Sequence, residues 1–427
     1  MAVPEPAVAV GEDPRSYARL MSAVYDATMT GRKAPARPRE VIGESWQRML
    51  ASGKDPDGRS APVVETAALD ALRRSSGLLD VLDEVSRGLQ SVVAEGDNIL
   101  VVADARGRVL WRSGSPAVLS NADRLGFVEG ANWGEGAVGT NAIGTALVSN
   151  RAVQVFSAEH FMRSHHSWTC AGAPIRDPRT GQVLGVVDVS GPAPTVHPTT
   201  IALVDVVARL AESHLRELHD HALNQLRTVA APILARIGRP ALAVDVDGWV
   251  AAVDSLPLHN RILLPDELEP GRVWIPTLGL CEVELLPGGW LVRPSDDDGA
   301  PALSSVVLDL SAGTAPMLEM VGQFGSWRRE ISLRHAEILL VLALHPEGRS
   351  APELADALYG DRGRVVTVRA EISRLRKQFA GLLLGQPYRF TDGAAVTVRY
   401  PGDRRTLLAA STAPAVATAR VGSGRTV

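Results

Sequence analysis

Residues 134–147 read GEGAVGTNAIGTAL, and this stretch decides how the first half of the chain is interpreted. Its first six residues match the G-x-G-x-x-G pattern of dinucleotide-binding folds, which requires a buried strand immediately before it. The preceding residues 125–133, LGFVEGANW, contain two glycines and predict no such strand. We therefore expect the glycines to form a loop that leads into the N-terminus of a helix near Thr140.

Two further stretches give this segment a family context. Residues 160–191 read HFMRSHHSWTCAGAPIRDPRTGQVLGVVDVSG, and residues 41–57 read VIGESWQRMLASGKDPD. Together with residues 134–147, they resemble the sensor region of acetoin-responsive activators and their relatives, and the resemblance covers residues 38–220. In that family the region is a GAF domain, so the resemblance implies an α/β sensor fold with a ligand pocket between its sheet and its loops.

The lysine content separates this chain from those activators, which usually continue into an ATPase that drives sigma-54 RNA polymerase. The sequence has 41 Arg and only three Lys, namely Lys33, Lys54 and Lys377. A phosphate-binding P-loop needs the pattern GxxxxGK[ST]. Only Lys54 follows a glycine, and Asp55 comes next. The sequence therefore excludes a P-loop ATPase and favours regulation through ordinary promoter occupancy.

Length and composition set the remaining bounds. The 427 residues suggest about three domains. The longest strong apolar run, 338–344, is far shorter than the ~20 residues that span a bilayer. The first residues carry no signal-peptide pattern, and two cysteines exclude a disulfide scaffold and a CxxC zinc site. We expect a cytoplasmic bacterial protein with no membrane association.

The resemblance implies an effector pocket in the GAF region. Aromatic walls with a few polar groups suit a small effector. The alternative interpretation is that Trp133, Phe156 and Trp168 only complete a core. No cofactor is required, and the effector is not identified by the sequence. The candidate pocket residues are Trp133, Asn141, Phe156, His160, Phe161, Trp168 and Cys170.

The histidines near Cys170 raise the question of a metal or haem. His160, His165, His166 and Cys170 follow the spacing H-x4-H-H-x3-C, which matches no established zinc pattern. We therefore expect no metal site. Cys170 is either a redox switch, if neighbouring His or Arg lowers its thiol pKa, or a small buried residue.

The C-terminal region differs in charge from the rest. Residues 328–405 contain 14 Lys and Arg against nine Asp and Glu, a net charge of +5, which leaves −9 for the remainder. A basic module on an acidic body suggests contact with nucleic acid. Three helices are expected at 333–344, 352–358 and 364–379, followed by a hairpin of strands 388–391 and 395–399. This order is typical of a winged helix-turn-helix.

The third of these helices carries the strongest DNA-binding signal. Val368, Ile372, Leu375 and Phe379 recur at helical spacing and predict one buried stripe. The segment TVRAEISRLRKQF at 367–379 resembles the recognition helix of response-regulator winged helices, usually TVDVHIxRLRKxL, and departs from it at residues 369–371. The resemblance implies double-stranded DNA as a partner. The expected DNA contacts are Thr367, Arg369, Ala370, Ser373, Arg374, Arg376 and Lys377.

The sequence thus predicts an α+β multidomain protein: a GAF α/β sensor with flanking helices, a small β-rich module and a C-terminal winged helix-turn-helix. A helical stripe at 203–218 suggests a homodimer. The predicted parts are an N-terminal helical region 1–62, the GAF sensor 63–235, the β-rich module and linker 236–328, the winged helix 329–405 and a disordered tail 406–427.

The expected function is a ligand-sensing transcriptional regulator and not an enzyme, because no catalytic motif such as GxSxG or HExxH occurs. One alternative is an enzyme on the GAF scaffold, similar to the free methionine sulfoxide reductases, although Cys170 has no second cysteine in this region. The other alternative is an adaptor whose C-terminal helices bind protein. Salt-dependent DNA affinity discriminates between these alternatives.

Overall fold

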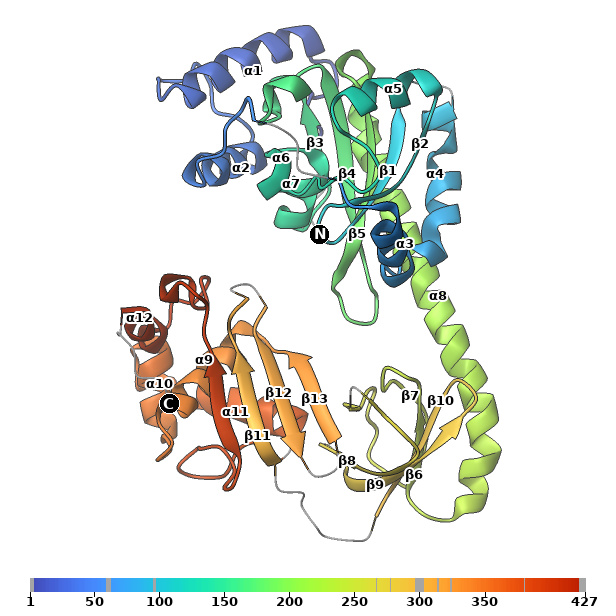
Figure 1. Ribbon diagram of the computed structural model, residues 1–427, viewed down its shortest axis with the longest axis vertical. Helices are drawn as coiled ribbons and strands as arrows, with labels where there is room; N and C mark the ends of the chain where they lie inside the picture. The colour runs from blue at the N-terminus through green and yellow to red at the C-terminus, as the bar shows by residue number, and fades with distance from the viewer. Residues whose placement is uncertain are drawn as a thin grey trace. The chain divides into compact units, whose positions relative to one another are not determined.

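The computed structural model divides into two compact units, Met1–His219 and Asp220–Val427 (Figure 1). It describes residues 4–421 apart from 59–62, 95–96, 266, 277, 296–302, 313–314, 323–324 and 380. The stretch DDDGAP at 296–301, the expected linker within residues 236–328, therefore lies outside the described residues, as does the end of the predicted tail. No helix within the described ranges is both long and apolar enough to cross a membrane.

The first unit is organised around one antiparallel five-stranded sheet with the order β2-β1-β5-β4-β3 (Figure 1). In the register of the two longest strands, Cys170 lies opposite Ser190 and Gly172 lies opposite Asp188. The strands are β1 (Ile99–Asp104), β2 (Val109–Gly114), β3 (Val153–Phe156), β4 (Trp168–Arg176) and β5 (Val183–Pro192).

Helices cover both faces of this sheet because alternate strand residues point to opposite sides. Val101 and Val186 face one core, beneath the N-terminal helices and the helices between β2 and β3. Leu100 and Val187 face the other core, beneath α3, α4 and the start of α8. The helices are α1 (Pro14–Met29), α2 (Glu40–Ala51), α3 (Thr66–Ser75), α4 (Leu82–Ala94), α5 (Pro116–Arg124), α6 (Glu135–Val138), α7 (Ala142–Ser149) and α8 (Pro198–Ile237).

The apolar stripe predicted on α8 is divided between core and surface. Val207 is buried against Gly88 of α4, whereas Val206, Leu210 and Leu218 are exposed. The stripe therefore contributes one row of side chains to the core and leaves another row uncovered within the first unit.

The second unit contains two sheets. The first has the order β7-β6-β10-β9-β8, and the end of α8 packs on it through Leu226, Ala230 and Leu234. Trp274 of this sheet makes an edge-on contact with Trp327 of the second sheet, at 5.4 Å between ring centroids. The strands are β6 (Ala241–Val244), β7 (Val250–Asp254), β8 (Gly271–Ile275), β9 (Gly279–Leu286) and β10 (Gly289–Pro294).

The second sheet of this unit has the order β13-β12-β11-β14 and shares one core with the C-terminal helices. Val306, Leu318 and Trp327 of its strands are buried in the same cluster as Ile338 and Ile372 of the helices. The elements are β11 (Leu303–Asp309), β12 (Met317–Gly322), β13 (Gly325–Glu330), α9 (Leu333–Leu344), α10 (Ala351–Tyr359), α11 (Val365–Gln378), β14 (Ala395–Arg399) and α12 (Pro414–Val421).

This shared core corrects the predicted boundary between residues 328 and 329, which falls inside β13. The strands from residue 303 onward belong with the helices because their apolar faces are buried against them. The predicted hairpin is also wrong. Residues 395–399 pair in parallel with β11, whereas Tyr388 and Phe390 form isolated bridges with Arg349 and Leu383.

The predicted disordered tail is wrong for residues 407–421, because this segment folds back onto the core. Leu407, Leu408 and Val416 are buried with the side chains of α9 to α11. The Nε atom of Arg420 in α12 donates to the carbonyl of Leu407 at 2.9 Å. The alanine-rich composition of this segment provides small helical side chains that pack closely, which composition alone does not distinguish from disorder.

Candidate functional site

A small cavity lies between strand β4 of the five-stranded sheet, the segment that joins α5 to α6 and the segment that follows β3. Its volume is about 10 Å³, which is space for about one water molecule. The walls consist of aromatic, apolar and sulfur-bearing side chains together with two histidines. The lining residues are Leu125, Phe127, Trp133, His160, His165, Trp168 and Cys170.

Four of the seven predicted pocket residues line this cavity: Trp133, His160, Trp168 and Cys170. The other three are buried elsewhere. Asn141 caps α7, because its Oδ1 accepts from the N–H of Gly144 at 2.9 Å. Phe156 packs with Ala7 and Val8 of the N-terminal segment, and the ring of Phe161 lies against Gly139.

Three lining residues were missing from the predicted set. Leu125 and Phe127 follow α5, in a segment whose sequence carries no signal beyond one aromatic residue. His165 was considered only as a metal ligand, yet its ring stacks on Trp133 at 4.9 Å between centroids. Its position in the motif HFMRSHH was the signal that could have placed it in the pocket.

The histidines of the cavity are neutral. Burial lowers the pKa of His160 to about 3 and that of His165 to about 4, because a buried site disfavours the charged imidazole. His160 Nε2 lies 3.3 Å from Cys170 Sγ. Burial also raises the pKa of the Cys170 thiol well above its ordinary value, so this sulfur is a poor nucleophile at neutral pH.

Two polar atoms of the cavity wall have no hydrogen-bond partner among the described residues: Trp133 Nε1 and His165 Nδ1. Both side chains are almost fully buried. A buried polar group without a partner is costly, and native proteins usually satisfy such groups with water or a ligand. These two atoms belong to residues that line the cavity and are therefore candidate contacts for a bound molecule.

His166, the remaining residue of the H-x4-H-H-x3-C spacing for which no metal site was expected, does not line the cavity. His166 Nε2 lies 3.1 Å from the carbonyl oxygen of His160, and its ring meets Tyr25 edge-on at 4.7 Å. Within the described part of the chain, no group of three or more His, Cys, Asp or Glu side chains could hold a metal ion.

A buried carboxyl group lies on the same sheet face as Cys170. Asp188 Oδ2 accepts from the hydroxyl of Ser190 at 2.6 Å, whereas Oδ1 has no partner among the described residues. Burial raises the pKa of Asp188 to about 7, against the smaller opposing effect of the Ser190 hydroxyl. Asp188 is therefore the group near the cavity that changes charge close to neutral pH.

The raised pKa of Asp188 predicts that stability depends on pH. Between about pH 4 and 7 the folded carboxyl holds a proton that the unfolded chain has released. The free energy of unfolding therefore falls as the pH rises across this interval, and the loss is complete above about pH 7. We expect the parent to lose stability relative to Asp188→Asn over this interval, measured by urea denaturation at several pH values. The histidines titrate in both proteins and cancel in the difference. A difference that does not vary with pH would contradict the prediction.

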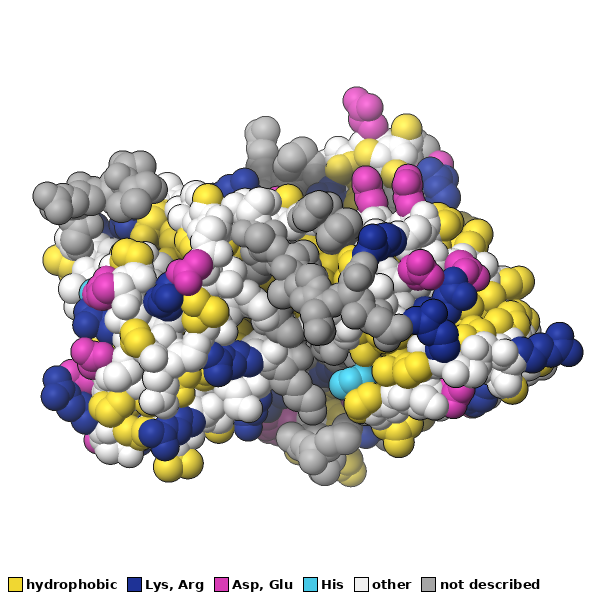
Figure 2. All heavy atoms as spheres, turned by 90° about the horizontal axis from the view of Figure 1, so that it is seen from below, with side chains coloured by type: hydrophobic (Ala, Val, Ile, Leu, Met, Phe, Trp, Pro, Cys, Tyr) yellow, Lys and Arg dark blue, Asp and Glu magenta, His cyan; other side chains and the backbone are white. Residues whose placement is uncertain are grey.

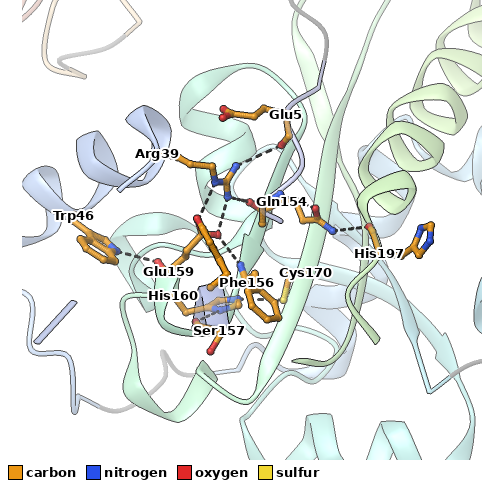
Figure 3. A network of polar contacts seen from close by, with 12 residues as sticks. Glu5, Arg39, Trp46, Gln154, Phe156, Ser157, Glu159, His160, Cys170 and His197 are labelled. Carbon is orange, nitrogen blue, oxygen red and sulfur yellow. Dashed lines mark hydrogen bonds and ion pairs between the residues drawn. The ribbon is translucent and has the colours of Figure 1, made fainter. Parts of the chain in front are cut away.

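Two ion pairs with buried carboxylates fasten the N-terminal helices to the segments beside the cavity. Figure 3 shows the first of them, between Arg39 and Glu159. Arg39 donates to both carboxylate oxygens of Glu159, at 2.9 and 2.7 Å. The indole of Trp46 in α2 donates to the carbonyl of Glu159 at 2.9 Å. Glu159 directly precedes His160, so the cavity wall and the N-terminal helices share one segment of chain.

The second ion pair joins Arg48 of α2 to Glu135 of the GEGAVG motif, at 2.8 Å. Glu135 also accepts hydrogen bonds from Ser45 and Thr145, at 2.5 and 3.0 Å. The carboxylate is nearly inaccessible to solvent. Glu135, which lies between the first two glycines of the motif, therefore anchors α2, and its carboxylate is not left available to bind a ligand.

The C-terminal unit presents a second candidate site on α11. The predicted buried stripe is confirmed, because Val368, Ile372, Leu375 and Phe379 are all at most 2% exposed. Arg376 is half-buried and lies over the ring of Tyr388 at 5.7 Å, and the side chain of Lys377 lies outside the described residues. The predicted contact residues whose side chains are exposed are Thr367, Arg369, Ala370, Ser373 and Arg374.

Comparisons with known proteins define the class and then the family. Residues 77–215 match the family model of the GAF domain, so this chain contains a GAF domain. It is 33% identical over 392 residues to the Rhodococcus erythropolis protein named "Uncharacterized 47.3 kDa protein in thcA 5'region", a match that covers 90% of this chain and 72% of that protein. The chain belongs to the same family as that protein.

Other relatives match less than half of the chain. The acetoin dehydrogenase operon transcriptional activator AcoR of Bacillus subtilis is 36% identical over 182 residues, which cover 42% of this chain and 30% of AcoR. The propane 2-monooxygenase operon transcriptional activator MimR of Mycolicibacterium smegmatis is 28% identical over 192 residues, which cover 45% of this chain and 32% of MimR. The chain thus matches about a third of the length of these activators.

Proposed function

We propose that this protein is a transcriptional regulator in which a small effector, bound by the GAF domain, changes DNA binding by the C-terminal unit. The observation that carries the proposal is the combination, in one chain, of a GAF region related to named operon activators with a helix whose exposed face is basic. Effector binding would shift the affinity for DNA through a coupling of about 1–3 kcal/mol.

The effector is proposed to be small and uncharged. The cavity holds about one water molecule, so a larger ligand must displace wall residues. His160 and His165 are neutral, and no Lys or Arg lines the cavity to balance an anion. Trp133 Nε1 and His165 Nδ1 would hydrogen-bond to the ligand.

The C-terminal unit is proposed to be a winged helix-turn-helix in which α11 enters the major groove. Its domain would begin at β11 and include α12, because one core joins these elements. Thr367, Arg369, Ala370, Ser373 and Arg374 would face DNA, whereas Arg376 would hold the helix against Tyr388. The loop after α11, rather than a paired hairpin, would form the wing.

Figure 2 shows Lys and Arg side chains interspersed with Asp and Glu side chains on one face of the molecule. We expect affinity for DNA to depend on particular residues of α11, whose exposed side chains include Arg369 and Arg374. The sequence has no P-loop, so we propose that the protein acts by promoter occupancy and not by ATP-driven activation of sigma-54 polymerase.

Arg374→Ala tests this function. If Arg374 contacts a base edge, the variant is expected to lose about 1–3 kcal/mol of specific binding. The measurement is selection of bound sequences from a random duplex pool, with the full-length protein at two salt concentrations. Arg236→Ala, which removes an exposed arginine of α8, is the matched control.

A motif recovered by the parent and the control but lost in Arg374→Ala would support the proposal, and a symmetric motif would support a homodimer. No enrichment by the parent in either salt, with or without candidate small effectors, would favour the alternative in which the C-terminal helices bind protein. Equal motifs from the parent and from Arg374→Ala would contradict the proposed docking of α11.

A further inference from the structure

A groove of about 320 Å³ lies in the second unit between α11, β13 and the connection from β7 to β8. Three arginines from these three segments line it: Arg261, Arg329 and Arg374. His259 and Gln378 contribute further polar groups, and two aliphatic side chains complete the wall. None of the residues that line the groove is acidic, so its positive charge is not balanced by its own walls.

Arg261 is held in place before any ligand arrives. Its Nε donates to the carbonyl of Asp247 at 2.9 Å, and its guanidinium lies over the ring of Trp249 at 5.2 Å. These two contacts restrict the side chain, which reduces the entropy lost when it binds a partner. Arg261 is therefore pre-organised to bind an anion.

The other two arginines lie on α11, the helix proposed to bind DNA, and on β13. Arg374 is exposed on α11 and forms an ion pair with Glu371 of the same helix, a carboxylate that lies outside the groove lining. Arg329 lies on β13, and within the described residues its side chain has no hydrogen bond or ion pair. Guanidinium groups bind phosphate oxygens through paired hydrogen bonds, so a phosphate is the group that this lining fits.

We propose that this groove receives a backbone phosphate of the bound DNA, so that the connection from β7 to β8 extends the contact made by α11. The inference rests on the proposed DNA binding by α11 and adds a contact from outside the winged helix. The open groove on the protein lies beside the exposed face of α11 and suits a polyanion. One DNA strand can lie across it while α11 occupies the major groove of the same duplex.

The test is a salt titration of binding to a labelled duplex of mixed sequence, followed by fluorescence anisotropy. Loss of one phosphate contact lowers the slope of log K against log salt by about 0.9, which corresponds to about eightfold weaker binding near 0.1 M salt. Arg261→Gln and Arg329→Gln are each expected to show this change. Arg261→Lys keeps the charge and should retain most of the slope, and Arg236→Gln should bind like the parent.

Arg329→Gln guards against an indirect effect, because within the described residues the Arg329 side chain has no hydrogen bond or ion pair for the substitution to break, whereas Arg261 packs on Trp249. Parent-like slopes in both Gln variants would overturn the inference and leave the proposed function intact. Failure of the parent to bind any duplex at low salt would overturn both. Tighter DNA binding by the two Gln variants would also overturn the inference, because such a result would mean that the arginines of the groove oppose DNA binding.

Free phosphate is distinguished from DNA by competition. If the groove takes a backbone phosphate, inorganic phosphate should inhibit DNA binding no more than chloride at equal ionic strength. Strong inhibition by inorganic phosphate that both Gln variants abolish, with their salt slopes unchanged, would assign the groove to a free anion and overturn the inference.

Discussion

Replacing Arg39 by methionine is expected to lower the free energy of unfolding of the first unit by about 3–5 kcal/mol. Glu159 is fully buried, and Arg39 supplies two charge-assisted hydrogen bonds to it. Without the guanidinium, a carboxylate remains in a site with little access to water, retaining only the hydrogen bonds from the Tyr17 hydroxyl and the N–H of Phe156. The large effect comes from the uncompensated charge and not from the attraction itself.

Two variants separate this explanation from a general loss of packing. Arg87→Met removes an exposed ion pair of similar length, Arg87–Glu84 at 2.6 Å, and should cost less than about 1 kcal/mol. Adding Glu159→Gln to Arg39→Met removes the buried charge and should recover part of the loss. Hydrogen exchange of the amides in α1, α2 and β3 measures the stability of this unit separately. A loss no larger than that of Arg87→Met would refute the argument.

The position of this ion pair links stability to sensing. Glu159 and His160 are adjacent, and His160 contacts Cys170 across the cavity. Movement of the segment after β3 to admit an effector would therefore disturb the contacts of Arg39 and Trp46 with Glu159. The N-terminal helices are thus placed to respond to the state of the cavity.

Local periodicity predicted the elements whose burial follows a single regular pattern. The helix expected at 333–344 matches α9, the helix expected at 364–379 matches α11 to within one residue at each end, and the apolar stripe of α11 is buried as expected. β4 was not predicted because its sequence, WTCAGAPIR, contains glycine and Pro174 within a strand that has neighbours on both sides. Proline and glycine usually argue against an interior strand, and here tertiary packing overrides that preference.

Long-range pairing and side-chain direction could not be predicted from local pattern. The turn at Gly393 suggested that residues 395–399 fold back on 388–391, but β11 offers a partner with buried Val306 and Leu308. In the GAF domain, aromatic character identified Trp133 and Trp168 but did not tell which buried residues face the cavity. Phe156 and Phe161 are equally apolar and pack elsewhere.

The second large effect is expected at Gly144, in the first turn of α7. A Cβ atom there would lie 2.3 Å from the backbone nitrogen of Glu135 and 2.8 Å from the carbonyl carbon of Gly134. Backbone atoms cannot move aside as a flexible side chain can, so α7 or the GEGAVG loop must shift. We expect Gly144→Ala to lower the free energy of unfolding by about 3 kcal/mol or more, measured by urea denaturation.

Gly136→Ala, in the neighbouring GEGAVG motif, is the matched control. We expect this substitution to raise the free energy of unfolding instead of lowering it. A Cβ atom at Gly136 would meet nothing within 4 Å, and the residue lies in α6, where alanine is favoured over glycine by about 0.5–1 kcal/mol. In a dinucleotide fold the second glycine of the pattern must be small, because the pyrophosphate approaches it. Here that second glycine, Gly136, has open space beside it, whereas Gly144, outside the pattern, must be small because a helix packs on the loop. Equal sensitivity at both positions would mean that the loop, and not its packing against α7, requires glycine.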